Sequence, residues 1–262
     1  LIGTQEISVL ALGISVLSVF KNIPKETIDM RSFIRHSLVC GLLSRIFAAH
    51  KNVPQTEQLF VSGLLHDLGR LILYNYFPDE SRNVLARSRN GNTLLYEEEK
   101  DYLGCDHAQL GVQLMKQWRL PLILENNILY HHKPSEAQQS VPAAIVHLAD
   151  IIANSLGIGS SGEKLIPPLD DNAWENLELS PSSFETIIGQ ATHRHQRPEL
   201  LQGRRPDPRH PGQVIHRYIG TVSDDLFDGP GPAPRQFLEF GQFGRVEVYQ
   251  HRCCSDPGVM WP

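Results

Sequence analysis

The chain has 262 residues, a formal net charge of -5 and a sequence pI of about 6.2. Hydrophobic residues make up 41% and charged residues 20%, which provides for a sizeable core and excludes wholesale disorder. The acidic balance argues against a general binder of nucleic acids or anionic membranes. Four cysteines without a C-x-x-C spacing exclude both a disulfide scaffold and a zinc ribbon.

The N-terminal segment carries the longest apolar stretch, residues 7–20, which is interrupted by three serines. This stretch is too short to cross a bilayer, and a core helix is expected instead. No basic region and cleavage site precede it, so no secretory signal is visible. We therefore expect a cytoplasmic protein that does not enter a membrane.

The body of the chain has apolar residues at helical intervals up to about residue 191. These intervals predict helices over residues 33–49, 58–76, 106–117, 121–131 and 142–156. Asp106 is the expected N-cap of the third helix, and Gly157 is the expected stop signal after the last one. No run of alternating residues competes with this pattern, so the predicted fold class is an all-α bundle.

The C-terminal segment, residues 192–262, differs sharply in composition. It contains nine arginines and no lysine, together with nine of the 18 prolines and eight of the 20 glycines. Prolines at this spacing forbid helices of useful length, which predicts a mostly irregular tail. The tail could be disordered. The change in composition is also consistent with an artefact such as a shifted reading frame, which mass spectrometry and the coding DNA would test.

Histidines and aspartates interrupt several of the predicted apolar helices. The pair His66–Asp67 interrupts one helix, and His147 and Asp150 lie three residues apart on another. Each could be a separate surface or core residue. However, burying a polar group without a partner costs roughly 2–7 kcal/mol, so several such groups indicate a shared partner. Imidazole and carboxylate groups are both good ligands for divalent Fe, Mn, Zn or Ni.

The adjacent pair His66 and Asp67 has a particular use in such a site. Neighbouring side chains on a helix diverge by about 100°. His66 could therefore bind one ion while the carboxylate of Asp67 bridges two.

The order of His36, His66–Asp67 and Asp150 resembles the H…HD…D metal signature of the HD superfamily of metal-dependent phosphohydrolases. The surrounding sequence is more similar still to the HDOD family. Six segments carry this resemblance: Arg35–Ser37, Ser62–Leu71, Gly104–Gly111, Trp118–Pro121, His131–Pro134 and Val146–Asp150.

The resemblance extends from about residue 1 to 160 and implies an HD-type helical bundle. It implies that residues 1–20 hold the last helix of a largely missing N-terminal HDOD subdomain. Residues 21–191 would then form the HD-like metal-binding domain, and residues 192–262 the tail.

The related HD-GYP phosphodiesterases use further ligands for a second metal, and His107, His131 and His132 stand at the matching positions. The resemblance thus implies one or two divalent ions (Fe, Mn, Ni or Zn). The first would take His36, His66, Asp67 and Asp150; the second would share Asp67 and take His107, His131 and His132. Two departures are visible: the Gly-Tyr-Pro signature is replaced by residues 133–137, and Arg70 stands where catalytic relatives often carry a phosphate-binding lysine.

Other polar and sulfur-containing residues receive simpler interpretations. His147 is expected to support the ligands rather than bind metal. Cys40 and Cys105 are expected to be buried apolar residues. The acidic run Glu97–Glu99 is interpreted as a solvated face or a helix start, and no glycine-rich phosphate loop or clear aromatic clamp is recognised.

Two functions from different classes follow. The main prediction is a metal-binding signalling or regulatory output module of bacterial signal transduction, whose partners are signalling proteins or domains. The alternative is a metal-dependent phosphohydrolase or phosphodiesterase that acts on a nucleotide, a cyclic dinucleotide or another phosphoester, with Asp67 and Arg70 as catalytic residues. No nucleic-acid partner is expected, because the tail arginines are scattered and offset by acidic residues.

Overall fold

A computed structural model describes residues 20, 23–180, 183 and 186–187. Within these residues every regular element is a helix, which confirms the all-α prediction. In chain order the elements are α2 (Met30–His50), α3 (Thr56–Leu65), α4 (Leu68–Tyr76), α5 (Pro78–Gly91), α6 (Leu95–Leu103), α7 (His107–Gln117), α8 (Leu122–Leu129), the short 3-10 helix η1 (Pro134–Glu136), α9 (Ser140–Ser155) and α10 (Asp171–Leu177). The predicted helix within residues 1–20 lies outside the described part except for Phe20, and the predicted tail lies wholly outside it.

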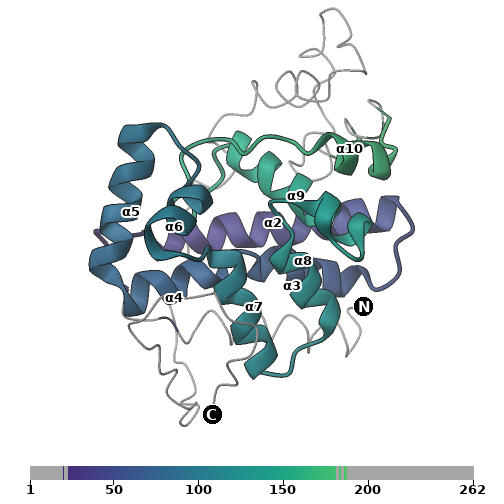
Figure 1. The fold of residues 1–262 in the computed structure, drawn as a ribbon. Helices are drawn as coiled ribbons and strands as arrows, with labels where there is room; N and C mark the ends of the chain where they lie inside the picture. Colours follow the sequence, from purple (N-terminus) through teal and green to yellow (C-terminus); the bar gives the residue numbers. More distant parts are fainter. Residues whose placement is uncertain (1–19, 21–22, 181–182, 184–185, 188–262) are drawn as a thin grey trace, which may run out of the picture.

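Two central helices, α2 and α9, run through the middle of the bundle and pack against each other (Figure 1). Helix α3 packs on α2. Helix α7 packs against α4 and against α8. Helices α5 and α6 pair at an edge of the bundle, and α10 packs on α9. One apolar core is centred on α3, α4, α7 and α8, and a second joins α2, α9 and α10.

Helix termini in the structure follow signals that the sequence carries. The Asp106 side chain caps α7 by accepting a hydrogen bond from the Gln109 N–H, and the Gln109 side-chain oxygen accepts one from the Asp106 N–H. The predicted N-cap is therefore confirmed. After α9, Gly157 has a φ of 65°, a left-handed conformation that suits a residue without Cβ. This confirms Gly157 as the stop signal.

The single helix predicted over residues 58–76 is wrong, because the chain breaks at His66–Asp67 into α3 and α4. The ring of His66 donates through Nδ1 to the Gly63 carbonyl at 2.8 Å, and Asp67 adopts φ -95° and ψ 10°. Periodicity could not show this break, because the stretches 59–65 and 68–74 are buried throughout.

Helices α5 and α6 were not predicted. Helix α5 buries only four of its 14 residues, so its apolar period is weak, although Pro78 at its first position favours a helix start. Helix α8 ends at Leu129, two residues earlier than expected. His131 and His132 therefore lie in a turn rather than on the helix, which leaves their rings free to point inward.

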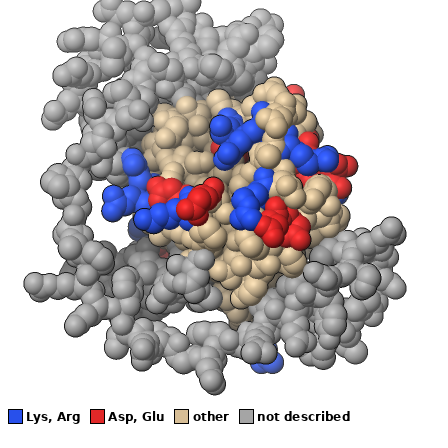
Figure 2. All heavy atoms as spheres, turned by 90° about the vertical axis from the view of Figure 1, so that its left-hand side faces the viewer, with Lys and Arg blue, Asp and Glu red and all other residues tan. Residues whose placement is uncertain are grey.

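The face formed by α5 and α6 carries both signs of charge in alternation (Figure 2). Arg87 on α5 contacts Glu98 at 2.7 Å and Asp101 at 2.6 Å on α6. This face therefore presents a mixed surface rather than a continuous basic patch. Separately, none of the helices in the described part is both long and apolar enough to span a membrane.

Candidate metal centre

All seven predicted metal ligands converge in the middle of the bundle. They come from α2, the turn between α3 and α4, the start of α7, the turn after α8, and α9. In chain order they are His36, His66, Asp67, His107, His131, His132 and Asp150. All are buried except His132, which is partly exposed.

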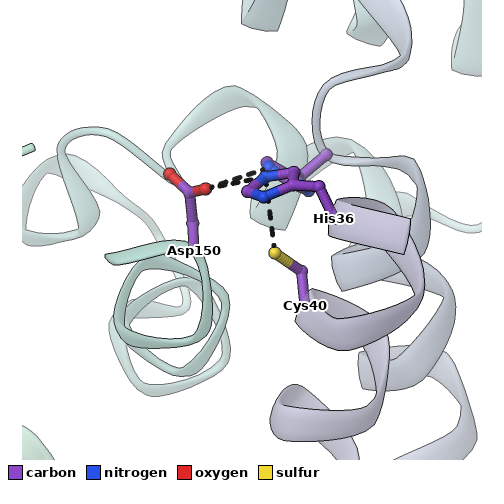
Figure 3. Close-up of side chains that lie close together, drawn as sticks. His36, Cys40 and Asp150 are labelled. Carbon is purple, nitrogen blue, oxygen red and sulfur yellow. Dashed lines mark hydrogen bonds and ion pairs between the residues drawn. The ribbon is translucent and has the colours of Figure 1, made fainter. Parts of the chain in front are cut away.

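The first donor set lies between α2 and α9. The Nε2 atom of His36 is 3.1 Å from Oδ1 of Asp150, and Nε2 of His66 is 3.4 Å from the same oxygen (Figure 3 shows the first contact). Cys40, one turn after His36, points into the same space. The donor atoms of His36, Cys40, His66 and Asp150 all lie within 4.8 Å of one another.

The second donor set consists of His107, His131 and His132. The Nε2 atom of His107 is 3.3 Å from Nε2 of His131 and 3.0 Å from Nε2 of His132. Three ring nitrogens from two separate elements therefore face one another.

Asp67 lies between the two sets, with one oxygen toward each. Its Oδ2 is 3.2 Å from Nε2 of His66 and 3.7 Å from Nε2 of His36. Its Oδ1 is 3.0 Å from Nε2 of His107. This is the arrangement that a bridging carboxylate requires, although the break at His66–Asp67, rather than a continuous helix, produces it.

Three of the rings are oriented by hydrogen bonds at their other nitrogen. Nδ1 of His66 donates to the Gly63 carbonyl, and Nδ1 of His131 donates to the Ile128 carbonyl at 2.7 Å. Nδ1 of His107 donates to the Glu99 carboxylate at 2.5 Å. Because the acceptors are carbonyl or carboxylate oxygens, Nδ1 carries the proton and Nε2 is directed at the centre, as in metal-ligating histidines.

Ionised carboxylates lie beside basic groups around the rings. Burial opposes ionisation of Asp67 and Asp150, yet Arg70, His66 and His107 hold the pKa of Asp67 well below its usual value, and bonds from His36 and His66 do the same for Asp150. Burial alone would lower the pKa of His66, but the two carboxylates raise it to about 10. By contrast, burial and the neighbouring rings of His66 and His107 lower the pKa of His131 well below its usual value.

These residues fit a divalent transition metal. Nε2 of His66 is buried and faces carboxylate oxygens of Asp67 and Asp150 at 3.2 and 3.4 Å. His131 is neutral with its proton on Nδ1, so its Nε2 lone pair faces the Nε2 of His107. Inward imidazole nitrogens beside ionised carboxylates could share a bound cation, and imidazole with carboxylate is a donor set typical of Fe, Zn or Ni sites.

Arg70 is buried next to this centre, and its guanidinium is already engaged. It contacts Asp67 Oδ2 at 3.2 Å and Glu99 Oε1 at 3.3 Å, and it donates to the Ser161 hydroxyl. The interpretation of Glu99 as a solvated residue is wrong, because α6 turns this side chain inward, where it accepts both the N–H and the Nδ1–H of His107. The signal was available, since Glu99 is four residues from both Leu95 and Leu103 and shares their apolar face.

His147 has the supporting place expected of it. Its Nδ1 donates to the His131 carbonyl at 2.7 Å, and its Nε2 accepts the Asp170 N–H at 3.0 Å. With both nitrogens occupied, His147 fixes the turn that carries His131.

Sequence reasoning missed the loop that follows α9, residues 157–163. Its Ser161 bonds Arg70, and the Ser161 carbonyl accepts the Tyr74 hydroxyl at 2.7 Å. Glu163 accepts the Leu95 N–H at 2.8 Å. The glycines at 157, 159 and 162 were the available signal, and the loop follows a helix rather than the strand of a dinucleotide-binding motif.

A groove of about 580 Å³ borders the second donor set. His132 and Tyr96 line it, and their rings stack with centroids 4.2 Å apart. Lys100, Asp106 and Glu136 also line this groove, which therefore presents both signs of charge near the partly exposed His132.

The sequence model of the HDOD domain family matches residues 1–134, just over half of the 262-residue chain. This match includes every predicted ligand except Asp150. Among curated proteins, no sequence matches the chain.

Several crystal structures share the fold. An HDOD domain protein of unknown function from Geobacter sulfurreducens is 22% identical with a TM-score of 0.54, over 82% of this chain and 69% of that one. A Shewanella amazonensis protein, provisionally described as a phosphohydrolase, is 19% identical with a TM-score of 0.52, over 80% and 70%. A Marinobacter aquaeolei protein, provisionally described as a signal transduction protein, is 19% identical with a TM-score of 0.52, over 65% and 38%.

Proposed function

Because this chain belongs to the HDOD family, we propose that it is a metal-binding regulatory module of bacterial signal transduction that acts by binding partner proteins. In this proposal the buried His/Asp centre stabilises the bundle, and the surface contacts signalling proteins or domains. Metal binding contributes folding free energy whether or not chemistry follows.

The observation that carries this proposal is the enclosure of Arg70. A phosphate-binding side chain must offer free N–H groups to its substrate. Here the guanidinium contacts Asp67, Glu99 and Ser161, and the exposed fraction of Arg70 is 2%. The loop that carries Ser161 is itself tied to α4 and α6, so the closed arrangement is supported from several sides.

Elemental analysis of the purified protein tests this proposal first, together with thermal unfolding before and after chelation. Near two equivalents of Fe, Mn, Ni or Zn would indicate that both donor sets are filled, and one equivalent would indicate a single filled set. We expect chelation to lower Tm and the metal-loaded protein to leave phosphoesters unchanged. No metal after reconstitution would contradict the metal-binding part of the proposal.

A metal-dependent phosphohydrolase is the second candidate function, favoured by the place of Asp67 between the two donor sets. Bound divalent ions would supply an activated water and charge compensation at the phosphoryl oxygens. Asp67 would hold the two ions together, while Arg70 could contact phosphate only after Ser161 had moved away. A phosphoester would reach the second donor set through the groove beside His132.

Incubating the metal-loaded chain with a panel of phosphoesters and cyclic dinucleotides separates the two candidates. Metal-dependent turnover that disappears in Asp67→Ala would establish the enzyme and contradict the purely regulatory role. Absence of turnover by a fully loaded protein supports the regulatory module. The missing Gly-Tyr-Pro signature makes cyclic dinucleotides the less favoured substrates in that panel.

A further inference from the structure

Cys40 lies inside the first donor set rather than in an apolar part of the core. Helix α2 places it four residues after His36, so both side chains point the same way (Figure 3). Its sulfur is 3.6 Å from Nε2 of His36, and the residue is fully buried. Its other hydrogen-bond contact is a long one of 3.9 Å to the Ala149 carbonyl.

The surroundings of this sulfur are unusual for a packing cysteine. The donor atoms of two imidazoles and one carboxylate all lie within 4.8 Å of it. One of those atoms, Nε2 of His66, is buried and makes no well-directed hydrogen bond, although carboxylate oxygens of Asp67 and Asp150 lie 3.2 and 3.4 Å away. A cysteine that serves only as a small hydrophobe would have apolar neighbours instead.

We propose that Cys40 is a metal ligand, which gives the first donor set two imidazoles, one carboxylate and one thiolate from His36, His66, Asp150 and Cys40. This inference rests on the proposed metal-binding function and assigns the chemistry of one of its sites. On binding of a divalent ion the thiol releases its proton to solvent, and the sulfur becomes a ligand as thiolate.

The thiolate restricts the metals that this set selects. Soft sulfur ligands favour Zn and other late transition metals, whereas Mg and Mn prefer oxygen.

Cobalt(II) is the probe, because a thiolate ligand gives an intense sulfur-to-cobalt charge-transfer band in the near ultraviolet. The full chain is loaded with Co(II), alongside Cys40→Ser and Cys40→Ala. Cys105→Ser and a Cys253→Ser/Cys254→Ser double variant are the matched controls, because they remove the other thiols of the chain. Zinc-loaded samples are examined by X-ray absorption for a sulfur shell at about 2.3 Å.

The wild-type chain and both controls should show the band and the sulfur shell, and both Cys40 variants should lose them. We also expect the Cys40 variants to bind the first ion at least about tenfold more weakly, since even groups that only orient a ligand change affinity about 10–100-fold. Metal bound without a band in the wild type, or a band that persists in Cys40→Ala, would overturn the ligand role and leave the proposed function intact. Failure of the wild type to bind any metal would overturn both.

The wild-type X-ray absorption spectrum needs no variant, so the test does not depend on the Cys40 variants folding. Circular dichroism shows whether they keep the helical bundle.

Discussion

The two donor sets differ in where their residues stand on the helices. In the first set His36, Cys40 and Asp150 lie within α2 and α9, and His66 alone stands at a helix end, after α3. The second set stands at helix ends: His107 opens α7, while His131 and His132 follow α8. Side chains within packed helices are held by the core, whereas those at helix ends depend on added hydrogen bonds.

Solvent access follows the same division. The residues of the first set are all buried, whereas His132 in the second set is partly exposed and lines the groove. We therefore expect the first set to act as the structural part of the centre and the second set to exchange its ion more readily.

Asp67→Ala is the largest expected perturbation, because it removes the contact common to both sets. It also leaves Arg70 buried with one carboxylate fewer, and breaking a buried pair costs about 3–5 kcal/mol. We expect lower metal content at both sets and a lower Tm, measured by elemental analysis and thermal unfolding. The same direction is expected for His66→Ala, and unchanged metal stoichiometry in both variants would contradict the site.

Glu99→Gln should affect the second set alone. The substitution keeps the volume but weakens the bonds to His107 and to Arg70, and hydrogen bonds to charged groups contribute about 1.5–3 kcal/mol each. We expect loss of about one ion with the other retained. Equal loss from both sets would show that the two sets are not independent.

Gly159→Ala and Gly157→Ala form a matched pair that tests the loop over Arg70. Both glycines have positive φ, 73° and 65°, so each change carries a similar backbone penalty. A Cβ at Gly159 would lie 2.3 Å from the Ser32 carbonyl oxygen, whereas one at Gly157 meets nothing within 4 Å.

Gly159→Ala should therefore destabilise the protein by about 1–3 kcal/mol more than Gly157→Ala does. It should also speed removal of the first ion by a chelator. Chemical denaturation measures the first effect, and metal release followed with a colorimetric chelator measures the second. Equal stability of the two variants would show that the loop can move away from the Ser32 carbonyl without a cost in free energy.

His132→Ala should change the stability of the fold least, and it tests most directly whether the two donor sets bind their ions separately. Its ring is partly exposed and stacks on Tyr96, so the loss of stability should be about 0.5 kcal/mol, as at most surface positions. The second ion should nevertheless bind more weakly, which titration calorimetry of the metal-free protein would detect. An unchanged second binding event would remove His132 from the set.

The sequence by itself determined the helical class, the caps at Asp106 and Gly157, and the family. These features are local, since capping residues and helical periods act within one or two turns. The resemblance to the HD and HD-GYP motifs also supplied candidate ligands on five separate elements, of which His66, Asp67 and Asp150 stand out in addition as ionisable residues on apolar helices.

Only the tertiary structure decided which candidate ligands belong to which donor set and which side chains enclose Arg70 beside them. The break at His66–Asp67 is invisible in a stretch that is buried on all sides, and it is what directs Asp67 at both sets. The contacts of Arg70 with Glu99 and Ser161 join residues 29 and 91 positions apart. Such contacts arise from packing between distant segments, which a local pattern of residue types does not encode.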